Sequence, residues 1–193
     1  QAMLAGDAMQ ALAFEVLTAP AQSSDAAFDV DPALQARLCS LLARAAGHAG
    51  MAGGQAIDLA SVGRPLDEAT LRDMHRRKTG ALLQGSVLMG AACGSTHAAA
   101  WQALADYGAA LGLAFQVVDD ILDVTQASDK LGKTAGKDVD ANKPTYVTAL
   151  GLEAARRYAV ELRQQAHAAL DRSGLDGVTI LSLLADRVVE REH

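Results

Sequence analysis

Aromatic residues are scarce in this sequence: phenylalanine, tryptophan and tyrosine together make up 4% of its 193 residues. Proline occurs four times, and no segment rich in Val, Ile and Thr shows the alternation between hairpin turns that predicts β-strands. Alanine and leucine are abundant instead, and half of all residues are hydrophobic. This composition predicts one all-α domain over residues 1–193 with an ample core and little or no sheet.

Basic residues are also outnumbered: the chain has 17 Lys and Arg against 23 Asp and Glu. The formal net charge is −6, which argues against a nucleic-acid-binding protein. Cys39 and Cys93 lie in apolar surroundings and lack the spacing of metal ligands, so we interpret them as buried free thiols in a reducing cytosol. No signal peptide is visible, and we expect a cytoplasmic location.

One uncharged run is long enough to cross a membrane. Residues 79–105 contain no Asp, Glu, Lys or Arg, and a membrane-spanning helix needs about 20 apolar residues. Gly85, Gly90 and Gly94 divide the run, however, and Ser95 is suited to cap a new helix. The sequence therefore predicts two buried bundle helices here, and no stable membrane insertion.

Helical periodicity and capping residues predict the order of the elements. Asp31 followed by Pro32 is a typical helix start. We expect this helix to continue through the glycine-rich segment G-H-A-G-M-A-G-G to about Leu59, supported by a tightly packed neighbour. The other predicted helices cover residues 1–18, a stretch from about 67, the stretch from 95 to the acids described below, a short stretch from 144, residues 151–173 and residues 175–193. On the inner face of the last helix we expect Ile180, Leu183, Leu184 and Val188.

The segment 107–124 is apolar on nearly every side, as expected of a helix inside a bundle. Asp119, Asp120 and Asp123 nevertheless lie near its end; Asp119 and Asp123 share a helix face, with Gln116 one turn before them. Carboxylates in an apolar setting repel each other and lose hydration, a cost that a cation offsets. An oxygen-only set suits Mg²⁺, which takes one or two carboxylates plus substrate phosphates. A solvated acidic helix end is the alternative, but the apolar setting and the lysine-rich loop that follows favour a metal site.

Two other polar sets precede this segment, and a third follows it. Gln55 and Asp58 are three residues apart on one helix face, a pattern that is unremarkable by itself. Lys78 ends the cationic run H-R-R-K and is followed at once by T-G-A-L-L, so it enters an apolar region and needs an anion. After the acids, a polar loop carries Lys130, Lys133, Lys137 and Lys143. Compact domains seldom keep such a long irregular loop without a use for it.

Five segments in the same order resemble the trans-isoprenyl diphosphate synthases, the polyprenyl synthetase family, and look most like its bacterial farnesyl diphosphate synthases. They are L-A-G-D-A-M-Q-A-L-A-F, G-G-Q-A-I-D, H-R-R-K-T-G-A-L, F-Q-V-V-D-D-I-L-D and L-G-K-T-A-G-K-D-V-D-A-N-K-P-T-Y. The fourth is similar to the family's second aspartate-rich motif. A lone Asp-Asp-x-x-Asp would be a weak signal, whereas five segments in register across nearly the whole chain are specific.

The resemblance implies an antiparallel helix bundle of the isoprenoid-synthase type that condenses an allylic diphosphate, dimethylallyl or geranyl, with isopentenyl diphosphate. The expected product is farnesyl diphosphate, the expected cofactor is Mg²⁺ with Mn²⁺ as an alternative, and the expected assembly is a homodimer. The implied metal ligands are Asp119, Asp120 and Asp123. The implied catalytic residues are Lys78, which holds the allylic diphosphate, and Thr79 and Gln116, whose oxygens face the developing carbocation. The implied substrate-binding residues are Gln55, Asp58, Lys78, Gln116, Lys133 and Lys143.

The chain opens at Gln1 inside an apolar helical pattern, without an initiator methionine. If the resemblance holds, the N-terminal third of the enzyme is absent. That third includes the family's first aspartate-rich motif and the basic residues that hold isopentenyl diphosphate. We therefore expect a fragment that is inactive or nearly so by itself, whose product length cannot be deduced.

Other functions stay open at this point. A terpene cyclase also ionises diphosphates with metal, but its usual second-site pattern, Asn/Asp-x-x-Ser/Thr-x-x-x-Glu, is absent. A related short- or medium-chain polyprenyl synthase fits the same motifs. A non-catalytic partner subunit of a prenyltransferase is a further alternative, and the presence of both the acids and the lysines argues against it. A purely structural bundle would show no thermal stabilisation by Mg²⁺ with diphosphate.

Overall fold

The described part of the chain is built from helices. The computed structural model describes residues 1–19, 30–64, 66–130 and 145–191. In chain order the elements are α1 (Ala2–Thr18), α2 (Pro32–Ala46), α3 (Met51–Ala60), α4 (Glu68–His75), the π-helical turn η2 (Arg76–Gly80), α5 (Ala81–Ala92), α6 (Ala98–Lys130), α7 (Tyr146–Leu150), α8 (Leu152–Ser173) and α9 (Thr179–Glu190). No strand occurs within these ranges, which confirms the all-α prediction.

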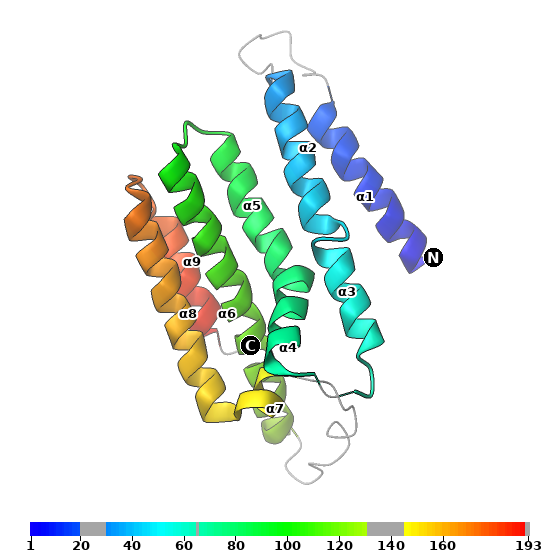
Figure 1. Cartoon of the computed structure of the whole chain (residues 1–193), viewed down its shortest axis with the longest axis vertical. Coiled ribbons are helices and arrows are strands. Elements are labelled where there is room, and N and C mark those ends of the chain that lie inside the picture. Colours follow the sequence, from blue (N-terminus) through cyan, green and yellow to red (C-terminus); the bar gives the residue numbers. More distant parts are fainter. Residues whose placement is uncertain (20–29, 65, 131–144, 192–193) are drawn as a thin grey trace.

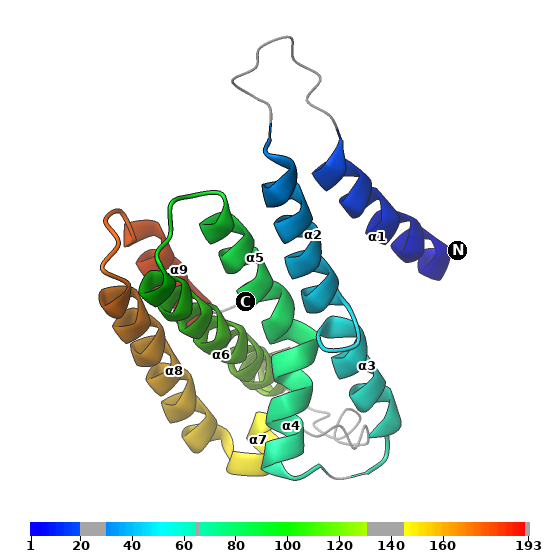
Figure 2. The same ribbon diagram turned by 45° about the horizontal axis from the view of Figure 1, so that its top comes forward.

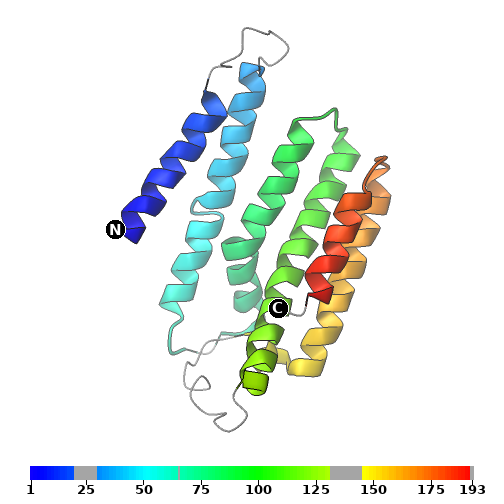
Figure 3. The same cartoon turned by 180° about the vertical axis from the view of Figure 1, so that it is seen from behind.

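The long helix α6 is the axis around which α5, α7, α8 and α9 pack. Helix α8 lies along one side of α6 and α5 along the other (Figures 1 and 2). Seen from behind, α9 lies against α6 and α8 (Figure 3). Helices α2 and α3 form the next layer beyond α5 and η2, and α1 is outermost, beside α2. Within the described residues, no helix combines the length and the apolar character needed to cross a membrane.

Two apolar clusters hold α6 in place. The first joins it to α4, α7 and α8 through Leu71, Val117, Tyr146 and Leu162. The second joins it to α8 and α9 through Tyr107, Leu111, Leu170 and Ala185. The Tyr107 hydroxyl also donates to the carbonyl oxygen of Leu181 at 2.7 Å. Burial raises the pKa of Tyr107 to about 12, so this phenol remains a neutral donor.

Helix α1 contributes nothing to these clusters. It contains no buried residue, and five of its large apolar side chains are exposed: Met3, Leu4, Met9, Leu12 and Val16. Phe14 and Leu17 are half-buried. The helical prediction for residues 1–18 is confirmed, but this helix has little of the apolar packing that normally stabilises helices in proteins.

Two of the predicted helix starts are confirmed. Asp31 caps α2, accepting a hydrogen bond from the amide of Ala33 at 3.0 Å. The helix expected from about residue 67 begins with Asp67 as cap, its carboxylate accepting from the amide of Thr70 at 2.7 Å. That hydrogen bond lowers the pKa of Asp67.

The prediction of one helix from Asp31 to Leu59 is wrong. Helix α2 ends at Ala46 and α3 begins at Met51, with a turn between them. A Cβ atom at Gly50 would lie 2.0 Å from the carbonyl oxygen of Ala45, so this corner requires glycine. Glycine costs a helix about 1 kcal/mol relative to alanine. Gly47 and Gly50 flank this turn, whereas Gly53 and Gly54 lie within α3.

Ser95 does not cap α6. The helix begins at Ala98, and the side chain of His97 takes the capping role, its Nδ1 accepting from the amide of Ala100 at 3.1 Å. The residue immediately before the first helical position is the one whose side chain reaches the free amides. Ser95 lies too far from that position.

The expected inner face of the last helix is also largely wrong. Ile180, Leu183 and Leu184 of α9 are exposed, whereas Leu181, Ala185 and Val188 pack against α6 and α8. These three are spaced by four and three residues, so they form a face of their own. The cysteine interpretation needs a similar correction, because Cys39 is half-buried and Cys93, at the C-terminal end of α5, is exposed; both are free.

Candidate functional site

Lys78 and Thr79 lie on the π-helical turn η2, between α4 and α5. The wider turn continues the α-helical backbone without a break, since the residues on either side keep right-handed helical angles. Single π turns inside helices are frequent at functional sites. The turn therefore widens one continuous helix at Lys78 and Thr79, the residues that the sequence singled out.

Glycines bring two helices, α3 and α6, close to this turn. A Cβ atom at Gly54 of α3 would lie 2.2 Å from the backbone nitrogen of Lys78, and one at Gly112 of α6 would lie 2.6 Å from the Cα of Gly80. No side chain fits in either space. The glycine-rich segment thus allows α3 to pack directly on the backbone of η2, while Gly112 and Gly80 do the same for α6.

The close approach of α3 pairs two of the predicted site residues. Lys78 Nζ lies 2.5 Å from Asp58 Oδ2. Lys78 is 32% exposed and Asp58 18%, so the pair is partly shielded from water. Asp58 is therefore the anion that the sequence required for this lysine. Gln55 lies one turn earlier on α3 and is half-buried.

A chain of hydrogen bonds runs from η2 through α6 to α7. The Thr79 hydroxyl donates to Gln116 Oε1 at 3.2 Å, and Gln116 Nε2 donates to Asp120 Oδ1 at 3.0 Å. The second oxygen of Asp120 accepts from the backbone amide of Tyr146 at 2.8 Å. Asp120 is only 3% exposed, so its carboxylate is compensated by these donors.

The three predicted metal ligands on α6 have different surroundings. Asp120 is buried beside Gln116, Asp119 Oδ1 lies 3.2 Å from Arg191 Nη2, and Asp123 is exposed. Among the described residues no group of three or more His, Cys, Asp or Glu side chains is arranged to hold a metal ion. Asp119, half exposed, and Asp123 still share a helix face and offer accessible oxygens. That donor set fits Mg²⁺, which needs only one or two carboxylates beside phosphates and water.

Two of the predicted substrate-binding residues, Lys133 and Lys143, lie outside the described residues. Tyr146 and Arg191 contact the predicted acids, but neither was singled out from the sequence. Tyr146 lies in the segment K-P-T-Y that carried the resemblance, so its motif was a usable signal. Arg191 lies in no motif, and its contact with Asp119 spans 72 positions, so no local pattern could have indicated it.

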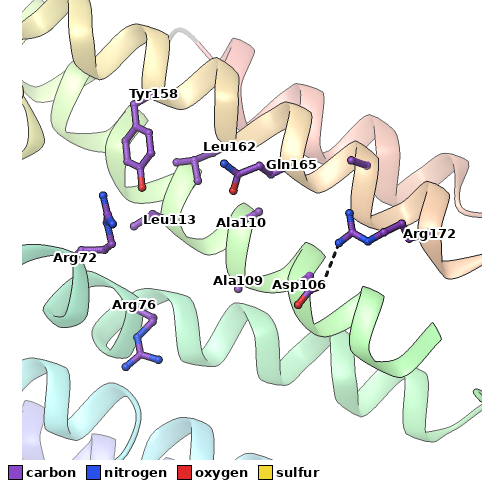
Figure 4. Close-up of a pocket in the computed structure, with 11 residues that line it drawn as sticks. Arg72, Arg76, Asp106, Ala109, Ala110, Leu113, Tyr158, Leu162, Gln165 and Arg172 are labelled. Carbon is purple, nitrogen blue, oxygen red and sulfur yellow. Dashed lines mark hydrogen bonds and ion pairs between the residues drawn. The ribbon is translucent and has the colours of Figure 1, made fainter. Parts of the chain in front are cut away.

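A groove among the described residues lies away from these side chains. Helices α4, α6 and α8 and the turn η2 enclose a groove of about 460 Å³ (Figure 4). Arg72 and Arg172 line it, but Arg72 pairs with Glu68 at 2.6 Å and Arg172 with Asp106 at 3.1 Å. Because these cations are compensated locally, and no predicted site residue from the described part of the chain lines the groove, we do not assign the site to it.

The chain is similar in sequence to proteins of bacteria and plants. A protein of Bradyrhizobium diazoefficiens named "Probable farnesyl diphosphate synthase" is 46% identical over 176 residues, covering 88% of this chain and 50% of that protein. The chloroplastic "Heterodimeric geranylgeranyl pyrophosphate synthase large subunit 1" of Arabidopsis thaliana is 42% identical over 195 residues, covering 100% of this chain and 52% of that protein. The chain thus spans about half the length of these relatives.

Solved structures agree with these sequences. The geranyltransferase of Helicobacter pylori, determined in complex with magnesium and isoprenyl diphosphate, superimposes with a TM-score of 0.76 at 31% identity, covering 96% of this chain and 58% of that one. The family model described as Polyprenyl synthetase matches residues 1–173. With this match over most of its length, the chain belongs to the polyprenyl synthetase family.

Proposed function

We propose that this chain forms part of the active site of a magnesium-dependent prenyltransferase. The reaction joins an allylic diphosphate, dimethylallyl or geranyl, to isopentenyl diphosphate head to tail, and yields farnesyl diphosphate and free diphosphate. The observation that carries this proposal is the contact between η2 and α6. It joins Thr79 to Gln116 at 3.2 Å, next to Lys78 and one turn before the acids.

Lys78 is proposed to bind the allylic diphosphate. Its ammonium group has three N–H donors, and Asp58 accepts from it at 2.5 Å, so further donors are available for phosphate oxygens. As the allylic C–O bond breaks, negative charge builds on the departing diphosphate. A donor already in place where charge develops typically supplies about 3 kcal/mol of transition-state stabilisation. Lys133 and Lys143 are proposed as further diphosphate contacts.

Gln116 and Thr79 are proposed to stabilise the allylic cation. The two hydrogen bonds of Gln116 fix its amide, with the NH₂ group on Asp120 and the oxygen toward Thr79. A neutral amide oxygen presents partial negative charge without being a strong nucleophile. The double bond of isopentenyl diphosphate then forms the new C–C bond, and the proton lost as the product double bond forms passes to the departing diphosphate.

The acids of α6 are proposed to serve the metal. Asp119 and Asp123 would hold Mg²⁺, or Mn²⁺ in its place, with Asp120 in support through its hold on Gln116. The bound ion supplies positive charge that neutralises the diphosphate. Gln55 and Asp58 line the same pocket in this proposal, with Asp58 keeping Lys78 oriented.

Binding of a non-hydrolysable allylic diphosphate analogue tests these roles directly. In calorimetry on this chain, Mg²⁺ should be required for binding, and Lys78→Ala and Asp119→Ala should each weaken it at least tenfold. Arg187→Ala removes a charge from an exposed position of α9 and serves as the control. Binding that is independent of Mg²⁺, or unchanged in both variants, would refute the proposal.

Turnover is best tested in the natural polypeptide, at the full length that its gene encodes. Asp119→Ala should lower the rate by about 10²–10³-fold, the usual effect of removing one electrostatic contact to the transition state. Product length is measured in the same assay. The relatives include both a farnesyl and a geranylgeranyl diphosphate synthase, so a C20 product would correct the farnesyl assignment. No product from either substrate would favour a non-catalytic partner subunit.

A homodimer in the cytoplasm is proposed as the working form. The exposed apolar side chains of α1, among them Met3, Leu4 and Met9, support burial of this helix against another chain. Light scattering on the natural polypeptide should give twice the mass of one chain, and a monomer at micromolar concentration would contradict the homodimer.

A further inference from the structure

Arg191 connects the end of α9 to the acid-bearing end of α6. Its guanidinium carbon lies 4.0 Å from the centroid of the Phe115 ring. Its Nη2 donates to the Phe115 carbonyl oxygen at 2.7 Å and to Asp119 Oδ1 at 3.2 Å. The side chain is 21% exposed, so the contact is partly shielded from solvent.

The anchor of this arginine does not depend on Asp119. The stacked ring and the short bond to a backbone carbonyl both come from Phe115. The link to Asp119 is longer and uses one nitrogen, rather than the two parallel bonds that arginine and carboxylate favour. The Nε group is buried and has no hydrogen-bond partner among the residues that the structure describes. Asp119 can therefore leave Arg191 while the guanidinium group stays where it is.

The rest of α9 is held separately. Glu190, the residue before Arg191, pairs with Arg163 of α8 at 3.0 Å. Asp186 lies 2.8 Å from His167 of α8. Because these contacts position α9 on α8, the exchange of one partner at Arg191 does not require the helix to move.

Given the metal role of Asp119 in the proposed function, on which this inference rests, we propose that Arg191 is the counter-ion of Asp119 in the metal-free site. A divalent cation must displace Arg191 from this carboxylate. Arg191 is thus a positioning residue: it keeps Asp119 from repelling its neighbouring acids, and it lowers the affinity of the site for the cation.

The experiment uses Mn²⁺ alone, titrated into this chain while the free ion is followed by electron paramagnetic resonance. Arg191→Gln should bind Mn²⁺ about 3- to 5-fold more tightly than the wild type, the size expected when a partly exposed ion pair no longer competes. Arg191→Lys keeps the charge and should stay within about twofold of the wild type. Arg187→Gln, with the same charge change four residues earlier, is the control.

Asp119→Asn separates this inference from the proposed function. If Asp119→Asn leaves Mn²⁺ binding unchanged, Asp119 is not a ligand and the proposed function fails with it. If Asp119→Asn weakens binding but Arg191→Gln binds no more tightly than its control, only the counter-ion exchange is overturned. In support of the exchange, Arg191→Gln should tighten binding in the wild-type background and have no effect combined with Asp119→Asn. If Arg191→Gln only disrupted the local structure, it would weaken Mn²⁺ binding instead of tightening it.

Discussion

The glycine at position 54 offers the sharpest test of how this site is built. A Cβ atom there would lie 2.2 Å from the backbone nitrogen of Lys78 and 2.6 Å from its Cα. Neither atom belongs to a flexible side-chain end, so Gly54→Ala must push α3 away from η2. The same displacement would lengthen the 2.5 Å contact between Lys78 and Asp58.

A matched substitution at another helical glycine isolates the free-energy cost of the steric overlap at Gly54. Gly90 lies in α5, and a Cβ atom there would meet nothing within 4 Å. Alanine stabilises a helix by about 1 kcal/mol relative to glycine, so Gly90→Ala should raise the free energy of unfolding by roughly that amount. Gly54→Ala gains the same propensity but adds an overlap that costs about 1–3 kcal/mol. The difference between the two variants should therefore be about 1–3 kcal/mol, the overlap cost alone.

Urea unfolding followed by circular dichroism measures both variants. In thermal unfolding, 1 kcal/mol should correspond to about 2–4 °C in Tm for a chain of this length. The diphosphate analogue described above should bind more weakly to Gly54→Ala and normally to Gly90→Ala. If Gly54→Ala is as stable as Gly90→Ala, the close packing of α3 on η2 is wrong, and with it the physical account of the glycine-rich segment.

Three further predictions concern the buried acid, the buried phenol and the cap of α4. Asp120→Ala should lower the free energy of unfolding by about 1–3 kcal/mol because buried donors lose their acceptor, whereas Asp123→Ala, at an exposed position, should change it by less than about 0.5 kcal/mol in urea titrations; equal effects would contradict their different placement. Tyr107→Phe removes one buried hydrogen bond to α9 and should cost about 1 kcal/mol, with faster amide exchange confined to α9 if the bond anchors that helix. The backbone hydrogen bond from Thr70 lowers the pKa of Asp67 from 3.8, so the stabilisation by this cap is present above that value and is lost as pH falls below it. The Tm difference between wild type and Asp67→Ala should therefore shrink in acid. A constant difference would exclude the charged cap as its source.

Local chemistry was enough to place much of the chain. Asp31 and Asp67 were recognisable as helix starts because a cap acts on amides two or three residues away, within reach of any sequence pattern. The spacing of Gln116 and the acids placed them on one helical segment for the same reason. The motifs identified the family before any coordinates, and the comparisons confirm that identification.

Packing between distant segments decided the rest. The sequence grouped Asp119 with Asp123 and Gln116, but the fold joins Gln116 to Asp120 and gives Asp119 to Arg191, 72 positions away. Which face of α9 is turned inward, leaving Ile180 exposed, is likewise set by neighbours on α6 and α8. Helical periodicity reports which side chains share a face, whereas the direction of that face depends on contacts between helices that no local pattern contains.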